Sequence, residues 1–209
     1  MRYPSGVEDN PCKQAFSATA KSERFLQELN FYQAIYEKWE TKRRLNLTVR
    51  LLDIGKQVRY GKRTWVRQDL EDIAFWKGLS PRMLMIGMNA SDFEGRLESA
   101  LRIDDEPSRV SALCDIRGMG AVLVSVVLMF TWPETCGFMD SHTCNALRYL
   151  GFNFPKKYST SRFTVGQLLA YLRIVRTLRE HKAVSSMEIA EALYALDSMS
   201  PSYRRMPRP

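Results

Sequence analysis

The chain has 209 residues, of which 45% are hydrophobic and 26% charged, a composition typical of one sizeable globular domain. Its longest apolar run, residues 121–130, is interrupted by Ser125 and is too short to cross a bilayer, which needs about 20 apolar residues. No apolar segment follows Arg2, so we expect no secretory signal, no membrane partner and an intracellular location, in the cytoplasm, the nucleoid or the nucleus. The net charge of +8 favours an anionic partner such as nucleic acid.

The first half of the chain predicts an irregular N-terminal arm followed by helices. Residues 1–18 contain prolines, a glycine and polar residues, which are typical of an arm without regular structure. Apolar residues recur every three or four positions over 22–39, which indicates a helix. Residues 44–59 fit a strand by alternation and also fit a helix, and we favour the helix because no other strand candidate could pair with it. Further helices are expected over 66–77, 81–88 and 92–101.

The second half predicts a pair of helices over 108–116 and 121–130, joined by a turn, and a helix that starts after Asp140 and ends at Gly151. Capping boxes predict two more helix starts, at Thr164 with Gln167 and at Ser185 with Glu188. About nine or ten helices without a strand define an all-α fold. We expect residues 19–209 to form a single domain folded as two helical lobes with a cleft between them.

The four cysteines, Cys12, Cys114, Cys136 and Cys144, include no C-x-x-C pair. Cys136, His142 and Cys144 could be imagined as zinc ligands, but a fourth ligand is missing. We therefore expect reduced thiols, no metal and no other cofactor.

The turn at residues 116–121, "IRGMGA", places two glycines directly before an apolar helix. The start of a helix has unpaired backbone N–H groups and a partial positive charge. Glycines there lack a Cβ atom, so a phosphate can approach those N–H groups closely. This pattern of an apolar residue, any residue, Gly, an apolar residue and Gly predicts a helix-hairpin-helix that binds the DNA backbone without reading sequence. The alternative is that Gly118 and Gly120 only permit a tight turn between helices.

The residues that follow this hairpin extend the pattern. "IRGMGAVLV" is followed by Trp132-Pro133, then "MDSHT", then Leu150-Gly151. With these blocks and their spacing, residues 110–151 resemble the helix-hairpin-helix DNA glycosylases, the endonuclease-III-like and adenine-glycosylase-like repair enzymes. The resemblance implies that double-stranded DNA is the partner and that residues 117–121, namely Arg117, Gly118, Met119, Gly120 and Ala121, bind its phosphates.

Asp140 matches the catalytic carboxylate of that family. Loss of a base from deoxyribose passes through an oxocarbenium-like transition state, which a nearby carboxylate stabilises directly or by activating water. The target nucleotide must first leave the base stack. The alternative role for Asp140 is that of an N-cap, because Asp is favoured directly before a helix. The two roles are compatible.

Several positions depart from the family pattern. The nucleophilic lysine of the lyase members falls on Val122, which cannot form a Schiff base, so we expect base removal alone unless another lysine, of which Lys77 is the candidate, takes its place. No cysteine follows Cys144, so the iron–sulfur cluster of the family is absent. Arg117 and Val124 stand where the family often has proline and alanine.

The base-binding pocket should lie between the lobes, beside Asp140. Trp76, Lys77, Trp132 and His142 are its candidate lining residues, with Phe75 as a further stacking surface. Each has an ordinary alternative: aromatic side chains pack in cores, a lysine at a helix end is solvated, and a histidine orients a helix start.

Three functions remain open from the sequence. The chain is a monofunctional DNA glycosylase acting on a damaged or mispaired base, a catalytically silent helix-hairpin-helix DNA-binding module, or a helical scaffold that binds protein. Steep weakening of binding with salt would separate the DNA-binding functions from the scaffold.

Overall fold

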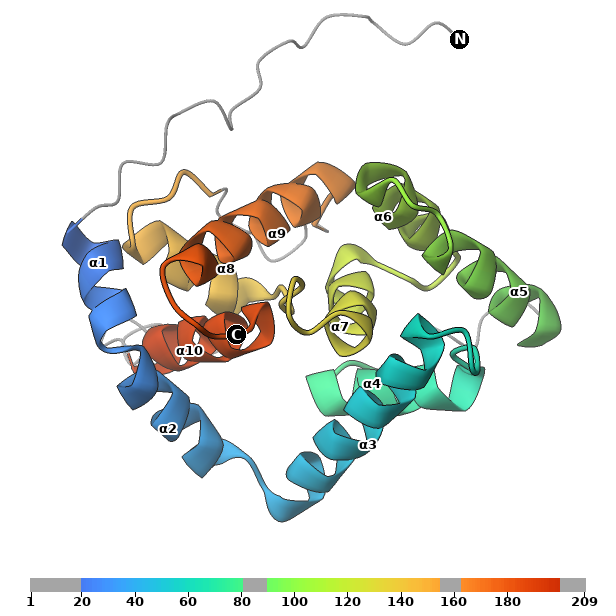
Figure 1. Ribbon diagram of the computed structural model, residues 1–209, viewed down its shortest axis with the longest axis horizontal. Helices are drawn as coiled ribbons and strands as arrows, with labels where there is room; N and C mark the ends of the chain where they lie inside the picture. Colours follow the sequence, from blue (N-terminus) through green and yellow to red (C-terminus); the bar gives the residue numbers. More distant parts are fainter. Residues whose placement is uncertain (1–19, 81–89, 155–162, 200–209) are drawn as a thin grey trace, which may run out of the picture.

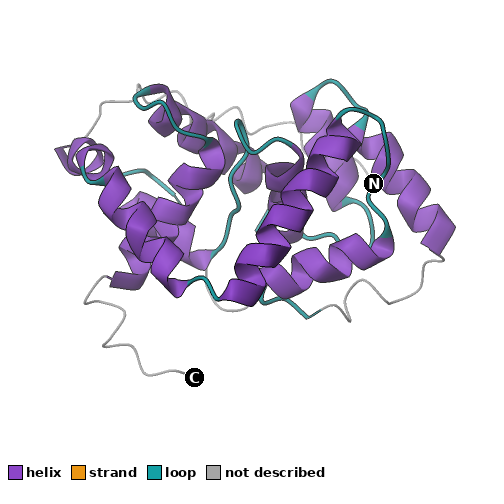
Figure 2. Ribbon diagram, turned by 60° about the horizontal axis from the view of Figure 1, so that its bottom comes forward, coloured by secondary structure: helices purple, strands orange, loops and turns teal. Residues whose placement is uncertain are grey.

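The computed structural model describes residues 20–80, 90–154 and 163–199. Within these ranges every regular element is a helix, which confirms the all-α class (Figure 2). The expected arm over 1–18 and the expected helix over 81–88 lie outside the described residues. The helices, in chain order, are α1 (Ala20–Gln27), α2 (Leu29–Trp39), α3 (Lys42–Arg59), α4 (Arg67–Lys77), α5 (Ala90–Leu101), α6 (Glu106–Cys114), α7 (Ala121–Thr131), α8 (Ser141–Tyr149), α9 (Val165–Glu180) and α10 (Ser186–Met199).

Most helix starts follow from local capping chemistry. The ambiguous residues 44–59 lie in α3, as expected, and the Thr41 hydroxyl accepts a hydrogen bond from the Arg44 N–H at its start. Both predicted capping boxes are present before α9 and α10. The single helix expected over 22–39 is instead two helices, because the backbone of Glu28 leaves the helical region, with φ −92° and ψ 10°.

Helix α7 forms the centre of the molecule and packs against α3, α4, α6 and α9 (Figure 1). Except for Val122, all its residues are buried. Gly55 on α3 allows the closest approach, since a Cβ atom there would lie 1.9 Å from the carbonyl oxygen of Phe130. Among the described residues, α7 included, no helix is long and apolar enough to cross a membrane.

The remaining contacts sort the helices around α10 and around α7. Helix α10 packs against α2, α8 and α9, whereas α3, α4, α5 and α6 follow one another around α7. Helix α9 contacts α6, α7 and α10 and therefore belongs to both groups. The segment between α7 and α8 runs from the helices around α7 to those around α10, and Asp140 lies at its end.

Candidate functional site

The corner between α6 and α7, residues 115–120, is partly exposed, and two buried apolar side chains anchor it to the core. Ile116 and Met119 are buried, while Arg117 and Gly120 are exposed. Gly118 has φ +90°, a conformation that favours glycine, and the Met119 N–H donates to the Ile116 carbonyl at 2.9 Å. Because the side chains of Met119 and Ala121 are buried, these two residues can offer a ligand only their backbone groups.

Helix α7 begins at this corner without a side-chain cap. Gly120 is its N-cap residue, and the first turn holds no acidic residue. A Cβ atom built on Gly120 would meet no heavy atom within 4 Å. By contrast, the side chains of Asp105 before α6 and Thr164 before α9 accept hydrogen bonds from the first turns of their helices. The corner thus offers open space next to backbone N–H groups.

The segment that leads into α8 is tied to its neighbours by two buried hydrogen bonds. The Tyr171 hydroxyl donates to the Phe138 carbonyl at 2.6 Å, and the Met139 N–H donates to Ser125 Oγ at 2.8 Å. Ser125 lies five residues after Gly120 in α7, about 7.5 Å along a helix axis at 1.5 Å per residue. Asp140, the next residue after Met139, is therefore held beside the second turn of α7.

Asp140 is the N-cap of α8, the alternative role that its position before a helix predicted. Its Oδ1 accepts from the Thr143 N–H at 2.9 Å, and its own N–H donates to Thr143 Oγ1 at 3.0 Å, which completes a capping box. Its Oδ2 forms an ion pair with the Nζ of Lys77. The side chain of Asp140 is 13% exposed, so both carboxylate oxygens have partners in a largely buried setting.

Lys77 is the last residue of α4, and its side chain is only 6% exposed. Its Nζ lies 4.3 Å from the ring centroid of Phe138 and 5.6 Å from that of Tyr194, positions suited to a cation over an aromatic face. Burial lowers the pKa of Lys77, and the Asp140 carboxylate offsets this only in part. Burial alone would raise the pKa of Asp140, but the Lys77 ammonium and the Thr143 N–H hold that pKa below its ordinary value.

The structure brings only part of the expected pocket to Asp140. Lys77 contacts it directly, and His142 packs its ring on Tyr194 at 4.6 Å while its Nδ1 lies 2.9 Å from Asp197 Oδ2. Trp76 is instead a core residue, 3% exposed, whose indole N–H donates to Thr48 Oγ1 at 2.8 Å.

Trp132 lies at the far end of α7 from the corner. It lines a cavity of about 350 Å³ that Asp140 does not line, and the guanidinium of Arg109 lies 4.6 Å from its ring centroid. Phe75 on α4 is half exposed. Among the described residues, no three Cys, His, Asp or Glu side chains converge to hold a metal.

Sequence reasoning missed the aromatic surroundings of the ion pair. Phe138 precedes Asp140 by two residues and could have been noticed for that reason. Tyr194 comes from the apolar face of α10, and Arg44 on α3 lies over the Trp76 ring at 4.6 Å. Neither belongs to a motif, so no local signal pointed to them.

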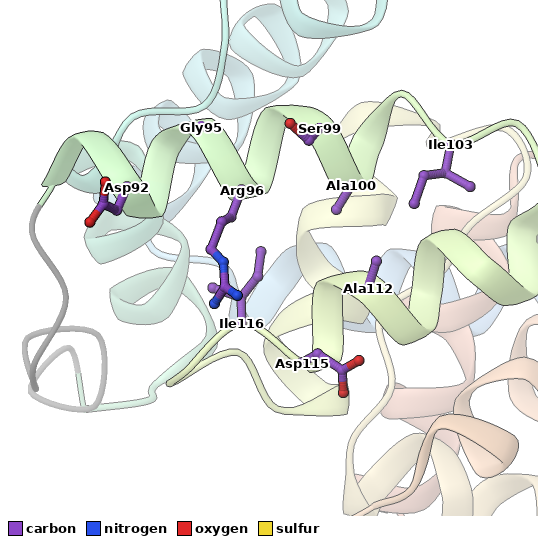
Figure 3. Close-up of a pocket in the computed structure, with 9 residues that line it drawn as sticks. All are labelled: Asp92, Gly95, Arg96, Ser99, Ala100, Ile103, Ala112, Asp115 and Ile116. Carbon is purple, nitrogen blue, oxygen red and sulfur yellow. The ribbon is translucent and has the colours of Figure 1, made fainter.

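A larger cavity, of about 740 Å³, opens between α5 and the end of α6 next to the corner (Figure 3). Arg96 extends into it from α5, and Asp92 and Asp115 stand at its ends. The two carboxylates offset the one guanidinium, so this cavity does not favour a phosphate. Neither Asp140 nor Lys77 lines it.

No protein-family model, no curated protein and no solved structure matches the chain. The functional interpretation therefore depends on the geometry of the corner and of the Lys77–Asp140 pair.

Proposed function

We propose that the chain is a helix-hairpin-helix DNA-binding protein of the base-excision type, acting as a monofunctional DNA glycosylase with Asp140 as its catalytic carboxylate. One observation carries this proposal. The hydrogen bond from the Met139 N–H to Ser125 Oγ ties Asp140 to the second turn of the same helix whose uncapped start is exposed. The groups of helices around α7 and α10 would be the two lobes, and the Lys77–Asp140 pair joins them.

DNA binding would begin at the corner. The space at the Cβ position of Gly120 is open, no side chain caps the start of α7, and the partial positive charge of a helix start favours a phosphate there. Arg117 is exposed at the same corner and would add a cation. Contacts of this kind hold the DNA backbone whatever its sequence, and the net charge of +8 supports the same partner.

The chemistry would be hydrolysis of an N-glycosidic bond. A nucleotide flipped out of the duplex next to the phosphate at the corner would bring its sugar toward Asp140. As the bond from C1′ to the base breaks, positive charge grows on the sugar, and an ionised carboxylate stabilises it while water adds at C1′. The lowered pKa of Asp140 supports this role, because the carboxylate is an anion at neutral pH.

The test is a panel of duplexes, each with one damaged or mispaired base, assayed for abasic sites. We expect wild-type protein to release a base from at least one duplex and Asp140→Asn to release none while still binding DNA. Asn is as good an N-cap as Asp, so the variant should keep the start of α8, but loss of the ion pair with Lys77 should lower its free energy of unfolding, which thermal unfolding measures. Equal base release by the variant and the parent would refute the role of Asp140.

A second candidate is a catalytically silent DNA-binding module. It is favoured by the fact that one oxygen of Asp140 caps α8 and the other pairs with Lys77. The same panel separates the two functions, because a silent module binds the duplexes and releases no base from any of them.

A further inference from the structure

Lys77 has no part in the chemistry just described, yet it contacts the proposed catalytic group. It is buried at the end of α4, on an element distant in sequence from α8, and Asp140 is its ion-pair partner. A buried lysine held against a carboxylate needs an explanation, because desolvation of the two charges costs free energy that their attraction must offset.

We propose that Lys77 is a positioning residue: its ammonium group keeps Asp140 ionised and fixes Oδ2 on the side of α4, and it does not act as a nucleophile. The inference rests on the proposed function in one respect, namely that Asp140 is the reacting carboxylate. The statement about charge concerns the free protein and can be tested without DNA.

The charged and titratable groups around the Asp140 carboxylate come from four helices. Among the described residues, Asp140 is influenced electrostatically by Lys77 from α4, His142 from α8, Tyr171 from α9 and Tyr194 from α10. Of these, only Lys77 forms an ion pair with it. Without that cation the carboxylate would keep its burial and lose its main compensation, so it would take up a proton at a higher pH.

The contacts of the Lys77 amine bear on whether it could act as a nucleophile. A nucleophilic amine needs a free electron pair, which an ammonium group lacks. Asp140 on one side and the rings of Phe138 and Tyr194 on others all stabilise the protonated form. Burial opposes that charge most strongly and lowers the pKa of Lys77 on balance, Arg44 of α3 opposes it more weakly, and Cys144 of α8 supports it weakly. The ion pair with Asp140 is therefore the main contact that holds the amine as a cation.

The experiment follows the side-chain carboxyl carbon of Asp140 by NMR during a pH titration of the full chain without DNA. In the wild type, Asp140 should titrate below the ordinary Asp value. In Lys77→Met, we expect its titration to move upward by about two pH units, the usual effect of removing an adjacent opposite charge. Lys77→Arg should restore much of the shift, and Lys56→Met, at an exposed position of α3, should leave the titration of Asp140 unchanged.

A wild-type Asp140 that titrates at or above the ordinary value would overturn the inference, and this measurement stands even if Lys77→Met fails to fold. An unchanged titration in a folded Lys77→Met would overturn it as well. Incubation of wild-type protein with an abasic duplex and borohydride tests whether Lys77 acts as a nucleophile. We expect no covalent adduct, and an adduct that is lost in Lys77→Met would show that the amine is a nucleophile.

The outcomes separate this inference from the proposed function. If the lesion panel shows no base release but the titration shifts as expected, the proposed glycosylase activity fails and Lys77 still sets the charge of Asp140. If base release is found, its acidic limb should move upward in Lys77→Met in parallel with the NMR titration. A merely structural ion pair would change stability without moving that limb.

Discussion

A substitution at Gly120 separates DNA binding from folding. Gly120 has φ −78°, which any residue can adopt, and its Cβ position is open. Asp and Asn are both favoured N-cap residues, so each variant should fold with a change in stability of only a few tenths of a kcal/mol relative to glycine. The two side chains are nearly equal in size and differ in charge.

The expected loss in Gly120→Asp follows from Coulomb's law. A carboxylate about 4 Å from a bound phosphate repels it by about 1 kcal/mol in water and about 4 kcal/mol near a protein surface. Those limits correspond to a weakening of the duplex Kd by about fivefold to about a thousandfold. Gly120→Asn carries no charge and reports the smaller effect of a neutral side chain that partly covers the N–H groups.

Fluorescence anisotropy with a labelled duplex over a salt series measures this difference. For the wild type we expect log K to fall linearly with log salt, and for Gly120→Asp a lower affinity with a shallower slope. Affinity in Gly120→Asp equal to that in Gly120→Asn at low salt would refute phosphate binding at the corner. Thermal unfolding of both variants provides the folding control.

Two further predictions concern stability. Gly55→Ala should lower the free energy of unfolding by about 3 kcal/mol or more, because the new methyl group collides with the backbone at Phe130. Gly95→Ala, in open space on α5, should raise the free energy of unfolding by about 0.5–1 kcal/mol. Chemical denaturation measures both, and a Gly55→Ala variant as stable as the parent would contradict the close packing of α3 on α7. Burial and the nearby Glu40 raise the pKa of Glu191 from 4.5 to about 8. The unfolded chain loses this proton first, so stability should fall as pH rises from 4.5 to about 8, by an amount on the order of a few kcal/mol. Glu191→Gln should therefore be more stable than the parent at about pH 8.5 and similar to it at about pH 4.5, and identical pH profiles would argue against a buried neutral carboxyl group.

The helices and the corner could be predicted from the sequence because the interactions that define them are local. Periodic apolar residues place a helix face, capping boxes such as that of Thr164 and Gln167 place a helix start, and Gly118 permits the positive φ of the turn. The N-cap role of Asp140 is local for the same reason, since its partner is three residues away.

The partner of Lys77 and the position of Trp132 were decided by the tertiary structure. Lys77 ends α4, which packs against α7, whereas Asp140 caps α8, which packs against α10. They meet because the segment before α8 is hydrogen-bonded to Ser125 of α7, and no spacing in the chain encodes that meeting. Trp132, although it follows α7 directly, lies at the end of that helix opposite the corner and so away from Asp140. Local propensities determine where helices begin and end, whereas which side chains become neighbours depends on the burial of apolar faces across the whole chain.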